Sequence, residues 1–213
     1  MKKALLLVLA MAFVGNAQAN YYLQGNVGAG DLIAKTEGET LKDRTTAVKL
    51  SFGKQAGQVR YVADIAKFGK IHDTHHYHSS ALNAQFDGTD QIELTANAIG
   101  AGVFYDFGGA GKIVPYVGAK LSANRLKLTL QEQQSITYLS GAVENRTDQI
   151  TASQNRFGYG VTAGAAYPFA QNWLADANVS YDDLGRLKWT HQDRTGIAKF
   201  RQTAINVGLR YQF

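Results

Sequence analysis

The sequence predicts an all-β protein, namely an eight-stranded antiparallel transmembrane β-barrel with short periplasmic turns and four long extracellular loops. Two observations lead to this prediction. After residue 20, apolar and polar residues alternate with a period of two in one segment after another, which is typical of strands whose two faces meet different surroundings. The connections between these segments are alternately short and long, as in barrels of the outer membrane.

Eight segments carry the alternation. In the final one, Ile205, Val207 and Leu209 share one face, while polar and small residues take the other. Segment 157–169 alternates in the same way, with Val161 on the apolar face and glycines opposite. The predicted strands are 21–33, 44–53, 58–68, 91–107, 113–130, 155–169, 172–184 and 199–213.

The short connections all follow aromatic residues. Phe52, Phe107 and Phe169 precede turns near 53–57, 108–112 and 170–172, and Phe213 ends the chain. Neighbouring strands would align these rings at the periplasmic boundary of the membrane, where aromatic side chains are favoured. The long polar connections, near 34–43, 69–90, 131–154 and 185–198, would then lie on the cell surface.

Two strands change the parity of their apolar residues. In 91–107 the apolar positions are even at Leu94 but odd from Ile99 onward, and in 113–130 they change from odd to even before Leu126. β-Bulges near Ala98 and Asn124 would explain the change. Alternatively, the outer halves of these strands project above the membrane, where no lipid imposes a pattern. We favour the second explanation because both changes lie on the loop side.

The face opposite the apolar one carries charges of both signs. If the apolar face meets lipid, these charges point into the barrel, where ion pairs can satisfy them. An eight-stranded barrel is only wide enough for side chains to fill it, so we expect a plug or at most a narrow pore. The predicted interior charges are Lys49, Arg60, Asp64, Lys120, Asp176 and Arg210.

The rest of the chain sets limits on class and location. Residues 1–19 are expected to be a signal peptide that is removed, because Lys2 and Lys3 precede an apolar run and a small-x-small site; residues 20–213 then form a single barrel domain. No later segment reaches the roughly 18 apolar residues of a transmembrane helix. The chain has no cysteine, and loss of Lys2 and Lys3 with the signal peptide leaves 20 basic against 17 acidic residues, a net charge of +3 that does not indicate nucleic-acid binding.

The second long connection contains four of the five histidines, within the run HDTHHYHSS. Imidazoles bind zinc or nickel well, but a flexible polar loop lacks the surroundings that a tight site needs. We therefore expect no metal and no cofactor, and instead assign the loop to ligand binding. The candidate residues are His75, His76, Tyr77 and His78.

One alternative is an enzyme. His78 and Ser80 are two residues apart, with Glu93 further on, and this resembles the His-x-Ser pair of outer-membrane lipid A deacylases. The pair lies in an early polar loop rather than on a late strand that faces the outer leaflet. We therefore expect that the protein is not an enzyme.

The fourth long connection combines basic residues with an aromatic one. Arg186, Lys188, Trp189 and Arg194 suit an anionic ligand such as a sulfated glycan or a lipopolysaccharide phosphate, and a solvated basic loop with an interfacial tryptophan is the simpler alternative.

Several strands resemble those of the opacity (Opa) family of outer-membrane adhesins, which are also described as opacity-family porins. The similar segments are 115–122 (PYVGAKLS), the glycine-rich 158–167 and the ending 208–213 (GLRYQF). The resemblance implies eight strands, a monomer, and surface loops that bind host-cell receptors or glycosaminoglycans such as heparan sulfate.

We therefore expect an outer-membrane surface protein whose loops bind host-cell or surface ligands. A small porin or structural barrel is the main alternative, and a lipid A-modifying hydrolase is the third. The expected partners are outer-membrane lipid and lipopolysaccharide, the barrel-assembly machinery through the strand ending in Phe213, and a host-cell receptor or glycosaminoglycan, with no nucleic acid.

Overall fold

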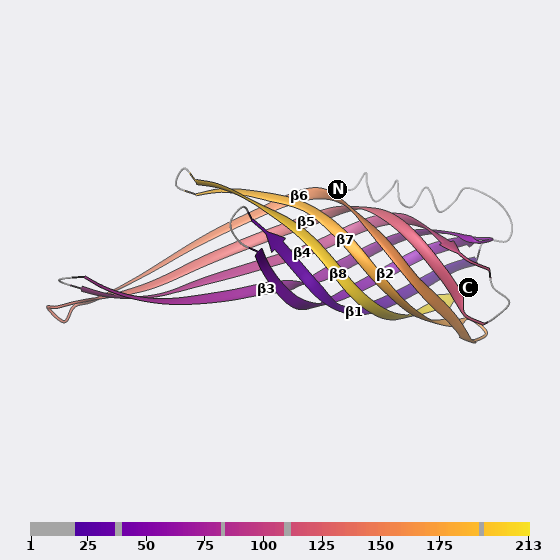
Figure 1. Ribbon diagram of the computed structural model, residues 1–213, viewed down its shortest axis with the longest axis horizontal. Helices are drawn as coiled ribbons and strands as arrows, with labels where there is room; N and C mark the ends of the chain where they lie inside the picture. The colour runs from indigo at the N-terminus through magenta and orange to yellow at the C-terminus, as the bar shows by residue number, and fades with distance from the viewer. Residues whose placement is uncertain (1–19, 37–39, 82–83, 109–111, 192–193) are drawn as a thin grey trace.

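The computed structural model describes residues 20–36, 40–81, 84–108, 112–191 and 194–213. The predicted signal peptide, residues 1–19, lies outside this part. Eight antiparallel strands, each hydrogen-bonded to the next, close into a barrel through pairing of β1 with β8 (Figure 1). The strands are β1 (Asn20–Lys35), β2 (Thr40–Ala56), β3 (Val59–Ala81), β4 (Ala84–Asp106), β5 (Val114–Tyr138), β6 (Val143–Ala170), β7 (Trp173–His191) and β8 (Arg194–Gln212).

The aromatic residues at the short-turn end contact one another as the sequence predicts. Phe213 stacks on Tyr21 and on Tyr211, with ring centroids 6.4 and 6.2 Å apart, and Phe52 lies 5.8 Å from Tyr21. Trp173 packs beside Tyr211 at 4.9 Å. β8, β1 and β2 are neighbours in the barrel, so these contacts join rings from both ends of the chain into one girdle.

The strands extend much further outward than the alternation indicates. β3 continues to Ala81 and β4 begins at Ala84, so most of the predicted loop 69–90 is a β-hairpin. β5 and β6 likewise extend over most of the predicted loop 131–154. The sequence signal is weak here because both faces of these hairpins are largely polar, and a pattern that depends on one buried face disappears.

No register shift occurs at Ala98 or Asn124. The ladder between β4 and β5 runs without interruption from Ala84↔Tyr138 to Asp106↔Tyr116. The change of apolar parity therefore has the second predicted cause: the faces keep their direction while their surroundings change. Irregularities occur instead at 68–70, 168–170 and 183–185.

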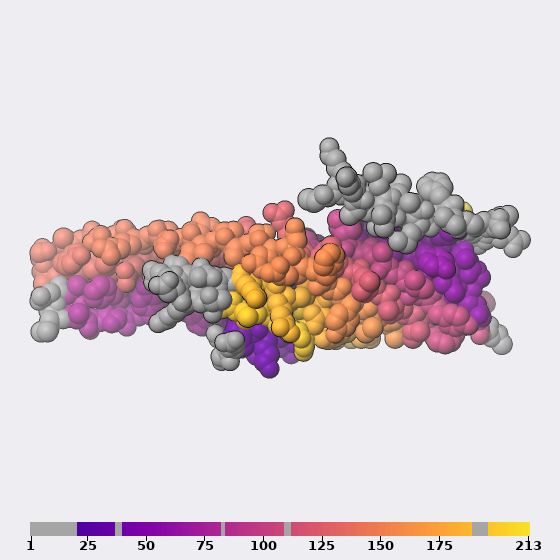
Figure 2. Space-filling view, turned by 90° about the horizontal axis from the view of Figure 1, so that it is seen from above, coloured from indigo at the N-terminus to yellow at the C-terminus, as the bar shows by residue number. Residues whose placement is uncertain are grey.

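The barrel opens into two walls toward its outer end. Pairing of β2 with β3 ends at Val48↔Lys67, and pairing of β6 with β7 ends at Tyr159↔Asp183. Beyond these points β3–β6 form one sheet, and β7, β8, β1 and β2 form the other. The first sheet is longer and makes the narrow outer end of the molecule (Figures 1 and 2).

The inside of the barrel has a polar layer and an apolar layer. Buried charged and amide side chains fill the half nearer the short turns. Above them, where the two walls face each other, lies an apolar core, of which the parity change had marked only the part on β4 and β5. Its members are Leu32, Ala34, Ala47, Ala66, Phe68, Ile71, Leu94, Ala96, Ala98, Leu126, Leu128, Leu184, Leu187, Ala198 and Phe200.

The outer surface of the closed part is apolar. Val48, Ile65, Val179 and Ile205 are each more than half exposed, which a soluble protein would not tolerate over a continuous belt. Each strand alternates such a residue with a buried one, as expected when lipid covers the outside. Among the described residues, no helix is both long and apolar enough to cross a membrane.

Candidate functional site

The outer halves of β3–β6 form a four-stranded sheet that begins at the apolar core and extends outward from it, which we call the outer sheet (residues 70–81, 84–95, 127–138 and 143–153). Its inner boundary is the row Lys70↔Thr95↔Lys127↔Ser153, and continuous ladders extend from there to Ala81↔Ala84 and Thr137↔Val143. In Figure 1 it extends well past the ends of the other four strands. The predicted ligand-binding residues of the second connection therefore lie on strands.

One face of the outer sheet, continuous with the lipid-facing surface below, carries almost only polar side chains. Register places them in rows such as His76↔Thr89↔Gln133↔Thr147 and His78↔Asp87↔Ser135↔Asn145. We call this surface the polar face. Neighbouring strands in a sheet are about 4.8 Å apart, so the side chains of one row are held at a fixed spacing. They can therefore present hydrogen-bonding groups in a set geometry.

Hydrogen bonds within the polar face orient the histidines. His76 Nδ1 lies 3.0 Å from Thr89 Oγ1, and His78 Nδ1 lies 2.6 Å from an oxygen of Asp87. A shallow depression of about 630 Å³ crosses the tip of the sheet. Its lining includes His76, His78, Gln133, Ser135, Asn145 and Thr147.

Tyr77 and His75 point to the opposite face. The Tyr77 ring lies over Gly88, its register partner, where a Cβ atom would collide with it. Its hydroxyl donates to Glu132 at 3.2 Å. Burial and this hydrogen bond raise the pKa of Tyr77. His75 is paired with Asp73 at 3.1 Å. Adjacent residues of the HHYH run thus point to opposite faces of the outer sheet. They do not form one site although they are neighbours in the sequence.

The tip of the β5–β6 hairpin has its own polar cluster. Tyr138 donates to Glu144 at 3.0 Å, and Arg146 pairs with the same carboxylate at 2.8 Å. The hydrogen bonds from Arg146 and Tyr138 lower the pKa of Glu144. Gly141, with φ of 80°, allows the tight turn between them. Sequence analysis missed this cluster because its members are separated by the turn.

The basic residues of the fourth connection lie elsewhere, on the β7–β8 hairpin of the shorter wall. Arg186 and Lys188 are exposed. Their backbone is tied to β6, because Arg156 donates to the Arg186 carbonyl at 2.6 Å and Gln154 donates to that of Lys188 at 2.6 Å. The side chains of Trp189 and Arg194 lie outside the described part. The two predicted sets therefore belong to different walls and do not form one site.

The six predicted interior charges are on inward-facing positions of their strands. Five of them form buried ion pairs: Arg210 pairs with Asp176 at 3.2 Å, Lys120 with Asp64 at 3.6 Å, and Arg60 with Asp106 at 2.8 Å. Lys120 also pairs with Asp182 at 3.0 Å, and Lys49 lies between buried Ala47 and Ser51. Sequence analysis missed Asp106 and Asp182, although both continue the inward alternation of strands already identified.

The hydrolase alternative gains no geometric support. His78 and Ser80 share the polar face, but His72, not His78, is opposite Glu93, whose carboxylate pairs with Lys70 at 3.1 Å. Within the described ranges, no group of three or more His, Asp or Glu side chains could hold a metal ion.

Comparison with known proteins shows a consistent relationship. The sequence profile described as "Opacity family porin protein" matches residues 52–213. The chain is 30% identical over 161 residues to the "Protein opa" of Haemophilus influenzae, which covers 76% of this chain and 99% of that protein. It is 26% identical to the opacity protein opA66 of Neisseria gonorrhoeae, with 78% and 77% of the two chains covered.

Solved structures show the same fold. Neisserial surface protein A superposes with a TM-score of 0.56 at 21% identity, covering 92% of this chain and 100% of that one. The outer-membrane protein OprG of Pseudomonas aeruginosa has a TM-score of 0.50 at 14% identity, with 93% and 98% covered. Both comparisons show that the chain shares the fold of these proteins.

Proposed function

The chain belongs to the opacity family of bacterial outer-membrane β-barrels, and from this premise we propose that it is a surface adhesin whose outer sheet binds a host-cell or other surface ligand. The observation that supports the proposal is the polar face, which four strands hold in register beyond the barrel. A sheet of this kind is already ordered before a ligand arrives, so binding costs less conformational entropy than it would in a flexible loop.

The chemistry of the polar face favours a ligand rich in hydrogen-bonding groups. Thr, Gln, Ser and Asn side chains both donate and accept, and the Asp87 carboxylate on this face is held by His78 at 2.6 Å. A glycan or a polar protein surface would fit these rows. An anionic glycosaminoglycan would instead be bound by Arg186 and Lys188 on the β7–β8 hairpin, so the two ligand classes predict different binding elements.

The first test is adhesion of whole bacteria to cultured epithelial cells. In one variant His72 is joined to Glu93, and Thr129 to Thr151, each through an Asn-Gly turn, which removes the outer part of the sheet while each pair stays in register. After equal surface display is confirmed, adhesion should fall to the level of bacteria that lack the protein. Unchanged adhesion would contradict the proposal.

Point variants then distinguish the two elements. Replacing His76, His78 and Gln133 with alanine should reduce adhesion while the barrel folds normally, because these side chains are exposed or half-exposed and hold no core contact. The matched control is Arg186→Gln with Lys188→Gln. If only this control reduces adhesion, the ligand is anionic and the binding element is the β7–β8 hairpin.

Three further features complete the proposal. The chain acts as a monomer and has no catalytic role, and the assembly machinery recognises the terminal strand through Phe213, which lies in the aromatic girdle. Deleting Phe213 should lower the folded fraction in the outer membrane, measured by heat-modifiable migration on gels, and wild-type yield from this variant would contradict it.

A further inference from the structure

A row of polar and basic side chains crosses β3–β6 directly above their apolar, lipid-facing residues. On the β3–β6 side, register aligns Lys67, Asn97, Arg125 and Asn155, all of them exposed. Two residues below this row lie Ile65, Ile99, Ala123 and Phe157, and Phe157 is 89% exposed. The row therefore marks the level at which the lipid tails end and the headgroups begin.

The basic residues of this row differ from those on the other side of the barrel in their pairing. There, Lys42 pairs with Asp31 at 2.9 Å, and Arg201 pairs with Asp183 at 3.6 Å. In the described ranges Lys67 and Lys127 have no acidic partner, and Arg125 donates only to the hydroxyl of Ser153 at 3.3 Å. The positive charge of β3–β5 is thus left for an anion from outside the chain.

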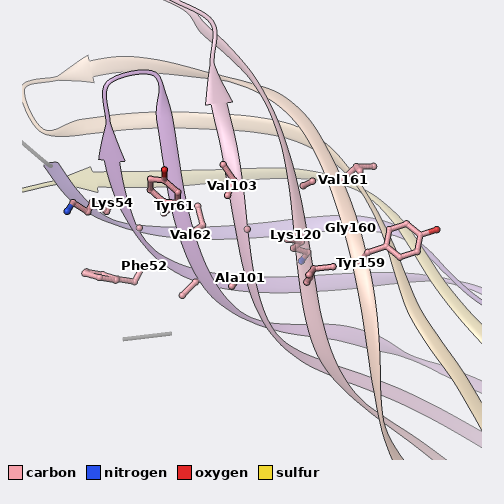
Figure 3. A pocket seen from close by; sticks show the side chains of 15 residues that line it. Phe52, Lys54, Tyr61, Val62, Ala101, Val103, Lys120, Tyr159, Gly160 and Val161 are labelled. Atoms are coloured by element: carbon pink, nitrogen blue, oxygen red, sulfur yellow. The ribbon is translucent and has the colours of Figure 1, made fainter. Parts of the chain in front are cut away.

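A groove of about 500 Å³ lies on the lipid-facing wall of these strands, between the basic row and the short turns (Figure 3), and runs from Leu121 and Tyr159 to Phe52 of the aromatic girdle. Its floor consists of small residues, Ala63, Ala101 and Ala119, and larger side chains such as Tyr61 and Tyr159 flank it. Leu121 is 72% exposed at its edge. From Leu121 to Arg125 is four residues, or about 13 Å along the strand.

We propose that this surface binds a phosphate-bearing, acylated lipid of the outer leaflet, with the phosphate on Lys67 and Arg125 and an acyl chain in the groove. Arginine and lysine form charge-assisted hydrogen bonds with phosphate oxygens, and Asn97 between them can donate another. The groove offers the apolar contact that a free phosphate cannot use. This inference rests on the membrane location of the barrel and is independent of adhesion.

The test measures binding of a bis-phosphorylated lipid A to the full barrel in neutral detergent by native mass spectrometry. The dephosphorylated lipid and inorganic phosphate are the two comparison ligands. Wild-type protein should retain the phosphorylated lipid at least about tenfold more strongly than either. Equal retention of the dephosphorylated lipid would overturn the proposed phosphate contact, and equal binding of inorganic phosphate would overturn the role of the groove.

Variants locate the site. Lys67→Gln with Arg125→Gln should weaken retention about tenfold or more, whereas Lys42→Gln with Arg201→Gln, the matched pair on the opposite side, should leave it unchanged. Ala101→Leu fills the groove from outside and should reduce retention of the acylated lipid. Because all these positions are at least partly exposed, folding can be verified by heat-modifiable migration. Equal effects of the two double variants would refute the assignment.

Discussion

At the scale of single residues, the Asp176 carboxylate joins four strands of the barrel interior. Its Oδ1 accepts hydrogen bonds from Tyr116 at 2.9 Å and from Asn178 at 2.8 Å, while Arg210 contacts its Oδ2 at 3.2 Å. Asn26 contributes a longer contact of 3.3 Å. These donors satisfy the hydrogen-bonding capacity of a carboxylate that is buried inside the barrel.

Replacing Asp176 with alanine should therefore be costly. The variant leaves the Arg210 guanidinium, which is 1% exposed, without its acid, and losing one partner of a buried ion pair costs about 3–5 kcal/mol. Urea-induced unfolding in lipid vesicles measures the loss. Asp87→Ala on the polar face is the control and should change stability by less than about 0.5 kcal/mol. Similar losses for both variants would mean that the interior ion pair adds nothing.

A second residue-scale prediction concerns the stability of the β5–β6 turn at acidic pH. The pKa of Glu144 is lowered in the folded hairpin by Arg146 and Tyr138, so its contacts stabilise the turn above the ordinary glutamate pKa and are lost as pH falls through the lowered value. The protection factor of the amides near Tyr138, which is the intrinsic exchange rate at a given pH divided by the observed rate, should fall over this acidic range. Glu144→Gln should remove the pH dependence; if it persists, another group is responsible.

At the scale of elements, three strand pairs use the same device, an aromatic ring lying over a glycine on the neighbouring strand. Tyr22 covers Gly53, Tyr77 covers Gly88, and Phe104 covers Gly118. The ring supplies the packing that the glycine lacks, and the missing Cβ makes room for it. One of these pairs lies in the outer sheet, so its order has a side-chain cause that can be tested.

Gly88→Val should displace the Tyr77 ring and loosen the β3–β4 hairpin without unfolding the barrel. The barrel ladders end well below this pair, so global stability should change little, while proteolysis at the hairpin should become faster. Tyr77→Ala is the matched control, because it removes the ring rather than its space. Protease resistance equal to that of the unmodified chain would contradict this account.

For the lipid-facing side of the strands we predict a large change in global stability, unlike at Gly88. Leu209, 51% exposed on the outside of β8, lies in the apolar belt, and an arginine near the bilayer midplane costs about 2–4 kcal/mol. Leu209→Arg should lower unfolding stability in vesicles by that amount. Gln133→Arg on the polar face should not, because water surrounds it. Equal damage from both would mean that the outside of the barrel does not face lipid.

At the scale of the whole molecule, two layers in series obstruct the barrel. Buried ion-paired side chains occupy the polar layer, and we expect the apolar core above it to exclude water and ions. The purified protein should therefore show no discrete conductance steps in planar bilayers, where a sixteen-stranded porin serves as the positive control. Replacing Leu94, Leu126 and Phe200 with serine removes only the upper layer. Conducting wild-type barrels would overturn this prediction.

The sequence by itself determined the strand count, the lipid-facing side, the aromatic girdle and the inward position of the charges, because each follows from a period of two along a single strand. Even the parity change near Ala98 was visible, and the uninterrupted register there excludes a β-bulge as its cause. The resemblance of segments 115–122 and 208–213 to the opacity family led to the same class of protein.

Only the tertiary structure decided where the strands end and which side chains meet. Hydrogen bonds to neighbouring strands, not local hydrophobicity, keep the polar hairpins extended to Ala81 and Tyr138. Register places His76 beside Thr89 on one face and Tyr77 over Gly88 on the other, and it separates both from Lys188. These relations depend on contacts between residues far apart in the chain, and no local pattern encodes such pairings.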